Sequence, residues 1–117
     1  MNVAELSSNL KREFKRRKYF VRMETLEQTM SLMKSRLFIS TDLFVQIYRN
    51  DRYNTTNLAL IHNGKRIFAR DEVDGKWHRH THLSPDIHDF SADGLIAIEL
   101  SEFLDEVEKV LADLNLP

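Results

Sequence analysis

The 117-residue chain contains no cysteine. Disulfide bonds, thiolate zinc sites and cysteine nucleophiles are therefore excluded. The absence of disulfides also agrees with a reducing compartment, and we expect a cytoplasmic protein.

Glycine, proline and long apolar runs are also scarce. Three glycines and two prolines leave little room for flexible linkers, and the length suits one domain over residues 1–117. No apolar run approaches the ~20 residues that span a bilayer, and residues 1–20 lack the apolar core of a signal peptide, so we expect no membrane partner. Glycine-rich nucleotide loops, the G-x-S-x-G elbow and the H-E-x-x-H zinc motif are absent from the sequence, which argues against the enzyme classes built on them.

Charge is distributed unevenly along the chain. Residues 1–22 carry seven lysines and arginines against two glutamates, whereas residues 86–117 carry nine acidic residues against Lys109 alone. A basic face suits an anionic partner such as RNA. The two ends could equally attract each other, within one chain or between the subunits of a homodimer, or form ordinary solvated helix faces.

Apolar spacing predicts a helix at each end. Leu6, Leu10 and Phe14 recur every four residues in a basic helix over 3–17. Ser101 is a suitable N-cap for an acidic final helix over 101–117, whose apolar residues fall on one face.

Alternating apolar residues between these helices predict a sheet. The expected strands are 19–27, 33–39, 43–49, 57–62, 65–71 and 95–100, and residues 78–82 are either a short strand or an extended loop. A helix is the rival for 41–50. Asn63-Gly64 is the strongest hairpin signal, since a type I′ turn needs positive φ at both positions, and Asp74-Gly75 marks another turn. The predicted fold is α+β, with a mainly antiparallel meander sheet of about five to six strands within residues 19–100, an N-terminal helix within 1–18 and the C-terminal helix.

Four of the five histidines lie between His78 and His88. If residues 78–82 are extended, His78, His80 and His82 point to one face, about 6–7 Å apart at each step, and Arg79 points to the other. This segment supports three interpretations.

The first interpretation is a metal site. Two imidazoles at i and i+2 on a strand, with a third ligand after a turn, can hold a divalent ion such as zinc. His88 could supply that third ligand, as could Asp86 or Asp89.

The second interpretation is metal-free acid–base catalysis, since unperturbed histidine titrates near pH 6.5. Arg66, Arg70 or Arg79 could neutralise a phosphate, and Tyr48 or Tyr53 could assist. Such a set suits RNA cleavage.

The third interpretation is structural, with histidines that satisfy backbone carbonyls or stack on Trp77. Trp77 itself is expected to anchor the core rather than to stack on a base. Asp71 could pair with Arg70 or orient a histidine.

The stretch from Ala59 to His88 reads ALIHNGKRIFARDEVDGKWHRHTHLSPDIH. Its order of a strand, a basic turn, R-I-F, an aspartate, W-H-x-H, a proline and a further histidine resembles the TumE-type toxin family of toxin–antitoxin modules, or an uncharacterised archaeal relative. The positions that match are Arg70, Asp71, His78, His80 and His88. The chain departs from the pattern at Glu72 and Thr81, and His82 is an additional histidine.

The resemblance implies a growth-inhibiting toxin that acts on RNA and is bound by an antitoxin protein. Under this interpretation His80 and His88 are the general base and acid, or metal ligands together with His78. Asp71 would orient an imidazole. Arg70 and Arg79 would contact the substrate phosphate. The rival function is a non-enzymatic binding module in which the histidines are structural or hold a metal.

Overall fold

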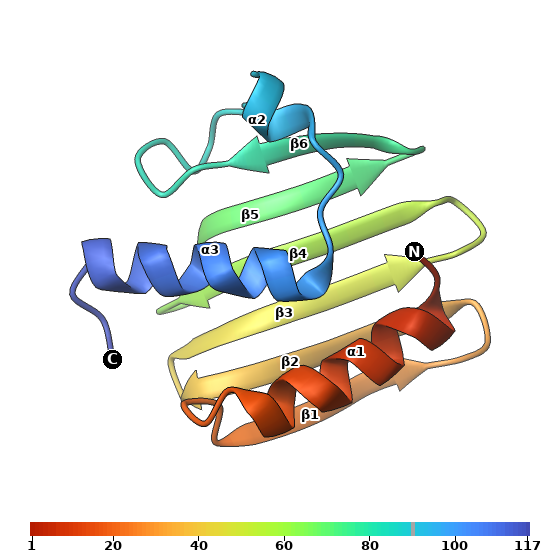
Figure 1. The fold of residues 1–117 in the computed structure, drawn as a ribbon, viewed down its shortest axis with the longest axis horizontal. Helices are drawn as coiled ribbons and strands as arrows, with labels where there is room; N and C mark the ends of the chain where they lie inside the picture. The colour runs from red at the N-terminus through yellow and green to blue at the C-terminus, as the bar shows by residue number, and fades with distance from the viewer. Residues whose placement is uncertain (90) are drawn as a thin grey trace.

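A computed structural model describes residues 1–89 and 91–117, and it confirms the predicted α+β fold. Six strands form one antiparallel meander in which each strand pairs with its neighbours in sequence (Figure 1). The strands are β1 (Arg22–Gln28), β2 (Leu32–Ser40), β3 (Leu43–Asn50), β4 (Thr55–His62), β5 (Lys65–Val73) and β6 (Lys76–His80). Residues 43–50 are thus a strand, not the rival helix.

The helices lie on one side of this sheet (Figure 1). They are α1 (Val3–Arg16), the short α2 (Ala92–Leu95) and α3 (Leu100–Asp113). The apolar stripe of α1 is buried at Leu6 and Leu10. In α3, the ring of Phe103 stacks on Phe68 of β5, with ring centroids 5.6 Å apart. The core therefore lies between the sheet and two helices that each bury one face.

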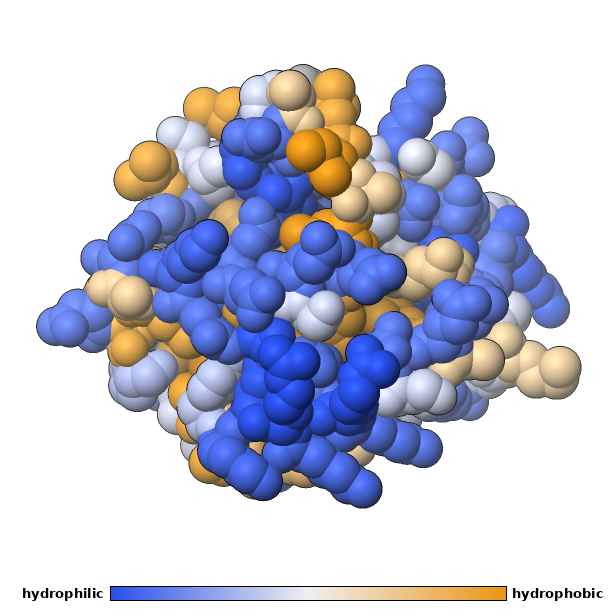
Figure 2. All heavy atoms as spheres, in the orientation of Figure 1, coloured by the Kyte–Doolittle hydropathy of each residue, from blue (hydrophilic) through white to orange (hydrophobic). Residues whose placement is uncertain are grey.

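The outer surface of this helix-covered side is largely hydrophilic (Figure 2). Apolar atoms gather on it near α2, where Leu95 and Ile96 are 50% and 58% exposed. No described helix is long and apolar enough to cross a membrane.

The two predicted turns are present. Asn63 and Gly64 have φ of 53° and 77°, and Asp74 and Gly75 have φ of 52° and 80°. Positive φ at both central positions matches the right-handed twist of the strands that the turn joins. These turns join β4 to β5 and β5 to β6.

A β-bulge in β5 decides which face each residue of β5 and β6 occupies. The pairing runs from Ile61 opposite Arg66 to Leu60 opposite Phe68, so Ile67 is the extra residue. A shift of one residue exchanges the two faces of a strand. As a result, Arg70 is paired with Leu58 and faces the helices, whereas Asp71 is paired with Asn57 and faces the other side.

The prediction of a strand over 95–100 is wrong. Leu95 ends α2, residues 96–99 have no regular structure, and Leu100 begins α3. Glu99 rather than Ser101 is the N-cap, and the Glu102 carboxylate accepts a hydrogen bond from the Glu99 N–H at 3.0 Å. A short apolar run does not distinguish a strand from an extended connection that buries alternate residues.

Candidate functional site

The histidine segment lies at the β6 edge of the sheet. His78 and His80 alternate with Trp77 and Arg79, so these two pairs occupy opposite faces. Trp77 is buried among core residues on the helix side, as predicted. His78 is paired in register with Asp71, so both lie on the uncovered face together with His80.

After β6 the chain turns back and returns alongside it. Arg79 and Asp89 form an antiparallel bridge, with backbone N–H···O distances of 3.2 and 2.7 Å. The Arg79 guanidinium also donates to the Asp89 carboxylate, at 2.7 Å from Nε. This return places His88, eight residues beyond His80 in the chain, beside both strand histidines.

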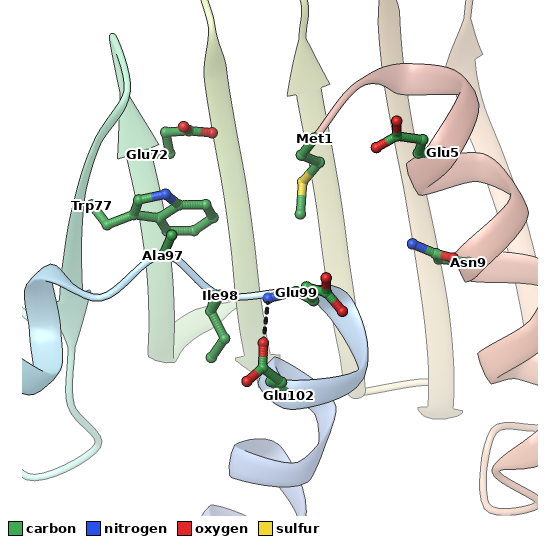
Figure 3. Close-up of a pocket in the computed structure, with 9 residues that line it drawn as sticks. All are labelled: Met1, Glu5, Asn9, Glu72, Trp77, Ala97, Ile98, Glu99 and Glu102. Atoms are coloured by element: carbon green, nitrogen blue, oxygen red, sulfur yellow. Dashed lines mark hydrogen bonds between the residues drawn. The ribbon is translucent and has the colours of Figure 1, made fainter.

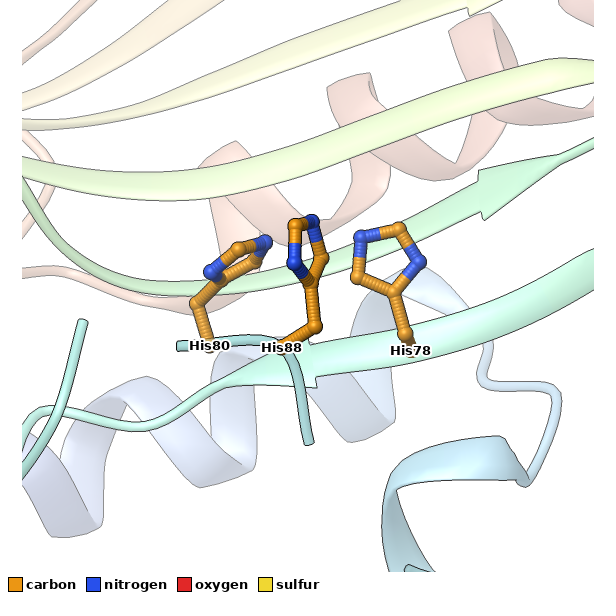
Figure 4. Close-up of side chains that lie close together, drawn as sticks. All are labelled: His78, His80 and His88. Atoms are coloured by element: carbon orange, nitrogen blue, oxygen red, sulfur yellow. The ribbon is translucent and has the colours of Figure 1, made fainter. Parts of the chain in front are cut away.

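The three rings of His78, His80 and His88 stand side by side, with His88 between the other two (Figure 4). One ligand nitrogen from each lies within 4.8 Å of the others. Ring centroids are 4.7 Å apart for His78 and His88, and 4.5 Å apart for His80 and His88. We call these residues the histidine cluster.

Asp71 adds a carboxylate to the cluster. Its Oδ2 lies 3.5 Å from His78 Nε2 and 3.6 Å from His80 Nε2. Its Oδ1 accepts a hydrogen bond from Asn57 Nδ2 at 3.0 Å. Asp71 is 6% exposed, and a buried carboxylate requires compensating positive charge or hydrogen bonds.

His80 is fixed in one orientation. It is 2% exposed, and its Nδ1 lies 2.9 Å from the carbonyl oxygen of Pro85. A carbonyl oxygen only accepts, so Nδ1 carries the hydrogen and donates it. In the neutral ring the lone pair is then on Nε2, which faces Asp71. A backbone carbonyl that holds the remote ring nitrogen is the usual support of a metal-binding histidine.

Burial keeps the strand histidines neutral. Desolvation is the largest cause that lowers the pKa of His78 and of His80, and the nearby Arg66 guanidinium lowers both further. The Asp71 carboxylate opposes this shift without reversing it. Neutral imidazole is the form that binds metal ions.

The cluster approaches the geometry of a tetrahedral zinc site, with its three imidazole nitrogens within 4.8 Å of one another before an ion draws them together. Zinc–nitrogen bonds of ~2.0–2.1 Å place neighbouring ligand atoms about 3.3–3.4 Å apart. The two distances from Asp71 Oδ2 to the imidazole nitrogens, 3.5 and 3.6 Å, are close to that value. They are long for hydrogen bonds but suit ligands that share one ion. Three imidazoles and a carboxylate are donors that zinc accepts.

Arg70 and Arg79, expected to bind the substrate phosphate, lie on the opposite face of the sheet from the histidine cluster. The Arg70 guanidinium donates to both carboxylate oxygens of Glu106 in α3, at 2.9 and 2.6 Å, and to a backbone oxygen of α2. Both arginines are therefore already bound to carboxylates.

The prediction that His82 shares a face with His78 and His80 is also wrong. The strand ends at His80, and His82 Nε2 lies 3.4 Å from Asp113 Oδ2 in α3. Thr81 begins the turn toward Pro85, so the period of two stops there.

Arg66 and Asn57 join the site. Arg66 was one of three arginines considered for phosphate, and its guanidinium lies 3.3 Å from His80 Nδ1. Asn57 carried no sequence signal, because its position opposite Asp71 depends on the bulge at Ile67.

The basic N-terminal helix lies on the helix-covered side, away from the histidine cluster (Figure 1). Arg17, which follows α1, donates to Glu13 at 2.9 Å and to Asp105 of α3 at 2.9 Å, and it also pairs with Glu108. The attraction between the basic and acidic ends, one of the alternatives that the charge distribution left open, is therefore present within one chain.

A hollow of about 400 Å³ lies on the helix-covered side, between α1, the start of α3 and the sheet. Trp77 forms one wall, and glutamates surround the opening (Figure 3). Of these, Glu72 accepts a hydrogen bond from Arg49 at 2.9 Å. This hollow faces away from the histidine cluster.

No protein-family model, no curated protein and no solved structure matches the chain. The site must therefore be interpreted from its own geometry.

Proposed function

We propose that the protein binds one divalent transition-metal ion, preferably zinc, through the histidine cluster, and that it uses this ion to hydrolyse RNA. The observation that carries the proposal is the convergence of three imidazole nitrogens within 4.8 Å of one another. Asp71 Oδ2, 3.5 and 3.6 Å from two of them, supports it as a nearby carboxylate that offsets the charge of the ion and leaves the fourth position of the ion to water.

The burial of His80 favours a metal ligand over a general base. A general base must reach the proton that it removes, directly or through one water. His80 is 2% exposed and its Nδ1 is held by Pro85. A metal ligand needs only to face its ion.

The exposure of His88 supports access from solvent. His88 is exposed, whereas His80 and Asp71 beside it are buried. A bound divalent ion would polarise a water molecule and offset the charge of a phosphate. In hydrolysis the oxygen of one water bonds to phosphorus, the leaving oxygen departs with a proton, and no other reactant is required.

A cation suited to a phosphate lies beside the cluster. Lys65, Arg66 and Pro85 line a surface hollow of about 510 Å³. Arg66 is exposed, and its planar guanidinium matches two phosphate oxygens. Arg66 thus takes the phosphate role that the sequence suggested for Arg70 and Arg79.

The biological role that we propose is that of a toxin in a toxin–antitoxin module. Its support is the resemblance of the stretch from Ala59 to His88 to the TumE-type family, together with the RNA chemistry proposed above. The partner would be an antitoxin protein that limits the activity.

The experiment is RNA cleavage by the wild type, by His88→Ala and by His82→Ala, each with zinc and with EDTA. We expect cleavage by the wild type and by His82→Ala with zinc, and none in EDTA or with His88→Ala. His82 is the matched control, because it lies outside the cluster. Cleavage that persists in EDTA would overturn the metal mechanism in favour of acid–base catalysis.

A second candidate is a binding module in which the metal is structural. The favouring observation is that Asp71 could fill the fourth position of a tetrahedral ion, and a structural zinc site is closed in this way. Zinc binding that raises the stability of a folded protein with no RNA cleavage would support this candidate.

A further inference from the structure

The face of the sheet that bears the histidine cluster is not covered by any described helix. In residues 1–89 and 91–117, α1 and α3 lie on the other side of the sheet. The Arg70 guanidinium, which faces that side, donates a hydrogen bond to a backbone oxygen of α2 and so holds α2 on that side as well. We call the histidine side the open face.

Strand pairing lines up side chains across the open face and leads to the cluster. One row runs from β2 to β6 through Arg36, Gln46, Ala59, Ala69 and His80. The next row runs through Lys34, Tyr48, Asn57, Asp71 and His78. At about 4.8 Å for each strand, each row is roughly 19 Å long. The small side chains of the two alanines leave the surface shallow in the middle of the first row.

Of the cations on the open face, Arg22 pairs with Glu24 at 3.7 Å, whereas three others have no described carboxylate within salt-bridge distance. Within the described part of the chain, Lys34, Arg36 and Arg66 form no salt bridge within 4.0 Å. On the helix side, by contrast, Arg49 and Arg70 each hold a carboxylate at 2.9 Å or less. Lys34, Arg36 and Arg66 thus supply positive charge that complements a polyanion. Glu24 and Glu27 of β1, opposite Arg36 and Lys34 in register, mark the edge at which this charge ends.

Tyr48 of β3 lies next to the basic strand β2, on the row that leads to the cluster. Phe44 is covered by the Arg36 guanidinium, 4.9 Å from the ring centroid, and Phe38 is covered by Arg22 at 4.1 Å. Among the described residues, nothing stacks on the ring of Tyr48, which is half-buried. An aromatic ring on a flat sheet can stack with a base that is not paired.

We infer that the open face binds single-stranded RNA, with phosphates at Lys34 and Arg36, a base stacked on Tyr48 and the scissile phosphate at Arg66 beside the histidine cluster. This inference rests on the proposed function, because it names the path by which an RNA substrate reaches the metal. A duplex is not expected to bind in this way, because its bases are stacked on each other.

The test is the affinity of a fluorescently labelled oligouridylate of about ten nucleotides, measured by anisotropy in EDTA. We expect Tyr48→Ala to weaken binding at least about fivefold and Tyr48→Phe, which keeps the ring, to bind as the wild type. Arg36→Gln should weaken binding and reduce the slope of log affinity against log salt by about one. Lys11→Gln, an exposed change on α1, is the matched control and should have no effect.

The inference is overturned if Arg36→Gln and Tyr48→Ala bind as the wild type, if only Lys11→Gln weakens binding, or if a duplex of the same length binds equally well. Absence of RNA binding by the folded wild type also overturns it, and a protein partner would then be the better occupant of this face. If Tyr48→Ala does not fold, the RNA affinity of Arg36→Gln and its salt dependence still test the inference.

The two proposals can fail separately. RNA binding on the open face without zinc binding would refute the metal centre alone. Zinc-dependent cleavage with an unchanged KM in Tyr48→Ala and Arg36→Gln would refute the RNA path alone.

Discussion

The Arg70–Glu106 pair gives a prediction that separates a structural arginine from one that binds substrate. Arg70 has a side chain that is 6% exposed and donates two hydrogen bonds to Glu106, whose side chain is 26% exposed. Arg70→Met preserves much of the aliphatic volume but leaves the glutamate without its cation.

The expected loss of stability follows from this burial. Removing one partner of a buried ion pair costs about 3–5 kcal/mol. Water reaches part of Glu106, so we expect the lower end, about 3 kcal/mol. A domain of this size typically has about 5–15 kcal/mol of stability, so the variant should still fold. RNA cleavage per folded molecule should not change.

Urea unfolding of Arg70→Met, Glu106→Gln and the double variant provides the measurement. The double variant should lose less than the sum of the single losses, by about 1 kcal/mol or more. Arg12→Met, on the exposed side of α1, is the control and should change stability by no more than ~0.5 kcal/mol. The reasoning is refuted if Arg70→Met is as stable as the wild type but cleaves no RNA, since Arg70 would then contact the substrate.

Three further predictions concern turns, titration and the boundary of the cluster. Gly64→Ala should lower the free energy of unfolding by about 1 kcal/mol in urea denaturation, because its φ is 77° although no atom lies within 4 Å of the added carbon; an unchanged midpoint would contradict this. Burial, followed by the hydrogen bond to Glu108, raises the pKa of Tyr19 above its ordinary value of 10.0, so its contribution to stability should be present below pH 10 and decline at higher pH. Tyr19→Phe should remove that part of the alkaline decline, and phenolate absorbance that appears at pH 10 for Tyr19 would argue against the shift. His82→Ala should leave zinc affinity unchanged by calorimetry, and a tenfold loss would place His82 in the centre.

Local sequence signals were sufficient for most of the fold. Asn63-Gly64 and Asp74-Gly75 place hairpin turns that need positive φ, and alternation placed β2 to β5 within a few residues. The bounds of α1 were predicted within one residue, and Asn2 caps this helix by accepting from the Glu5 N–H at 2.9 Å. The N-cap of α3 is Glu99 rather than the predicted Ser101. The features that were predicted correctly depend on neighbours in the chain.

The errors came from features that are not local. The apolar residues from Leu95 to Leu100 resemble a strand, but they pair with no strand of the described sheet, and only Ile98 and Leu100 are buried. Glu13 is fully buried and accepts from Arg17 at 2.9 Å. Arg17 in turn contacts Asp105 of α3 at 2.9 Å, a partner distant in the sequence that local signals cannot specify.

The residues that make up the site could also be predicted only where local signals were sufficient. The alternation of side chains along a strand places His78 and His80 on one face and Arg79 on the other, and this was predicted. The face on which they lie depends on the bulge at Ile67, because without it Asp71 would face the helices. No composition signal marks that bulge, so neither the partnership of Asp71 with Asn57 nor the distance of Arg70 from the cluster could be foreseen.

The most direct test of the metal centre is calorimetric titration of the metal-free protein with zinc, in the wild type and in His88→Ala and His82→Ala. We expect one zinc ion per chain for the wild type and for His82→Ala, and at least a tenfold loss of affinity for His88→Ala. A folded wild type that binds no zinc, or a His88→Ala variant that binds it as tightly, would rule out a metal centre at the histidine cluster.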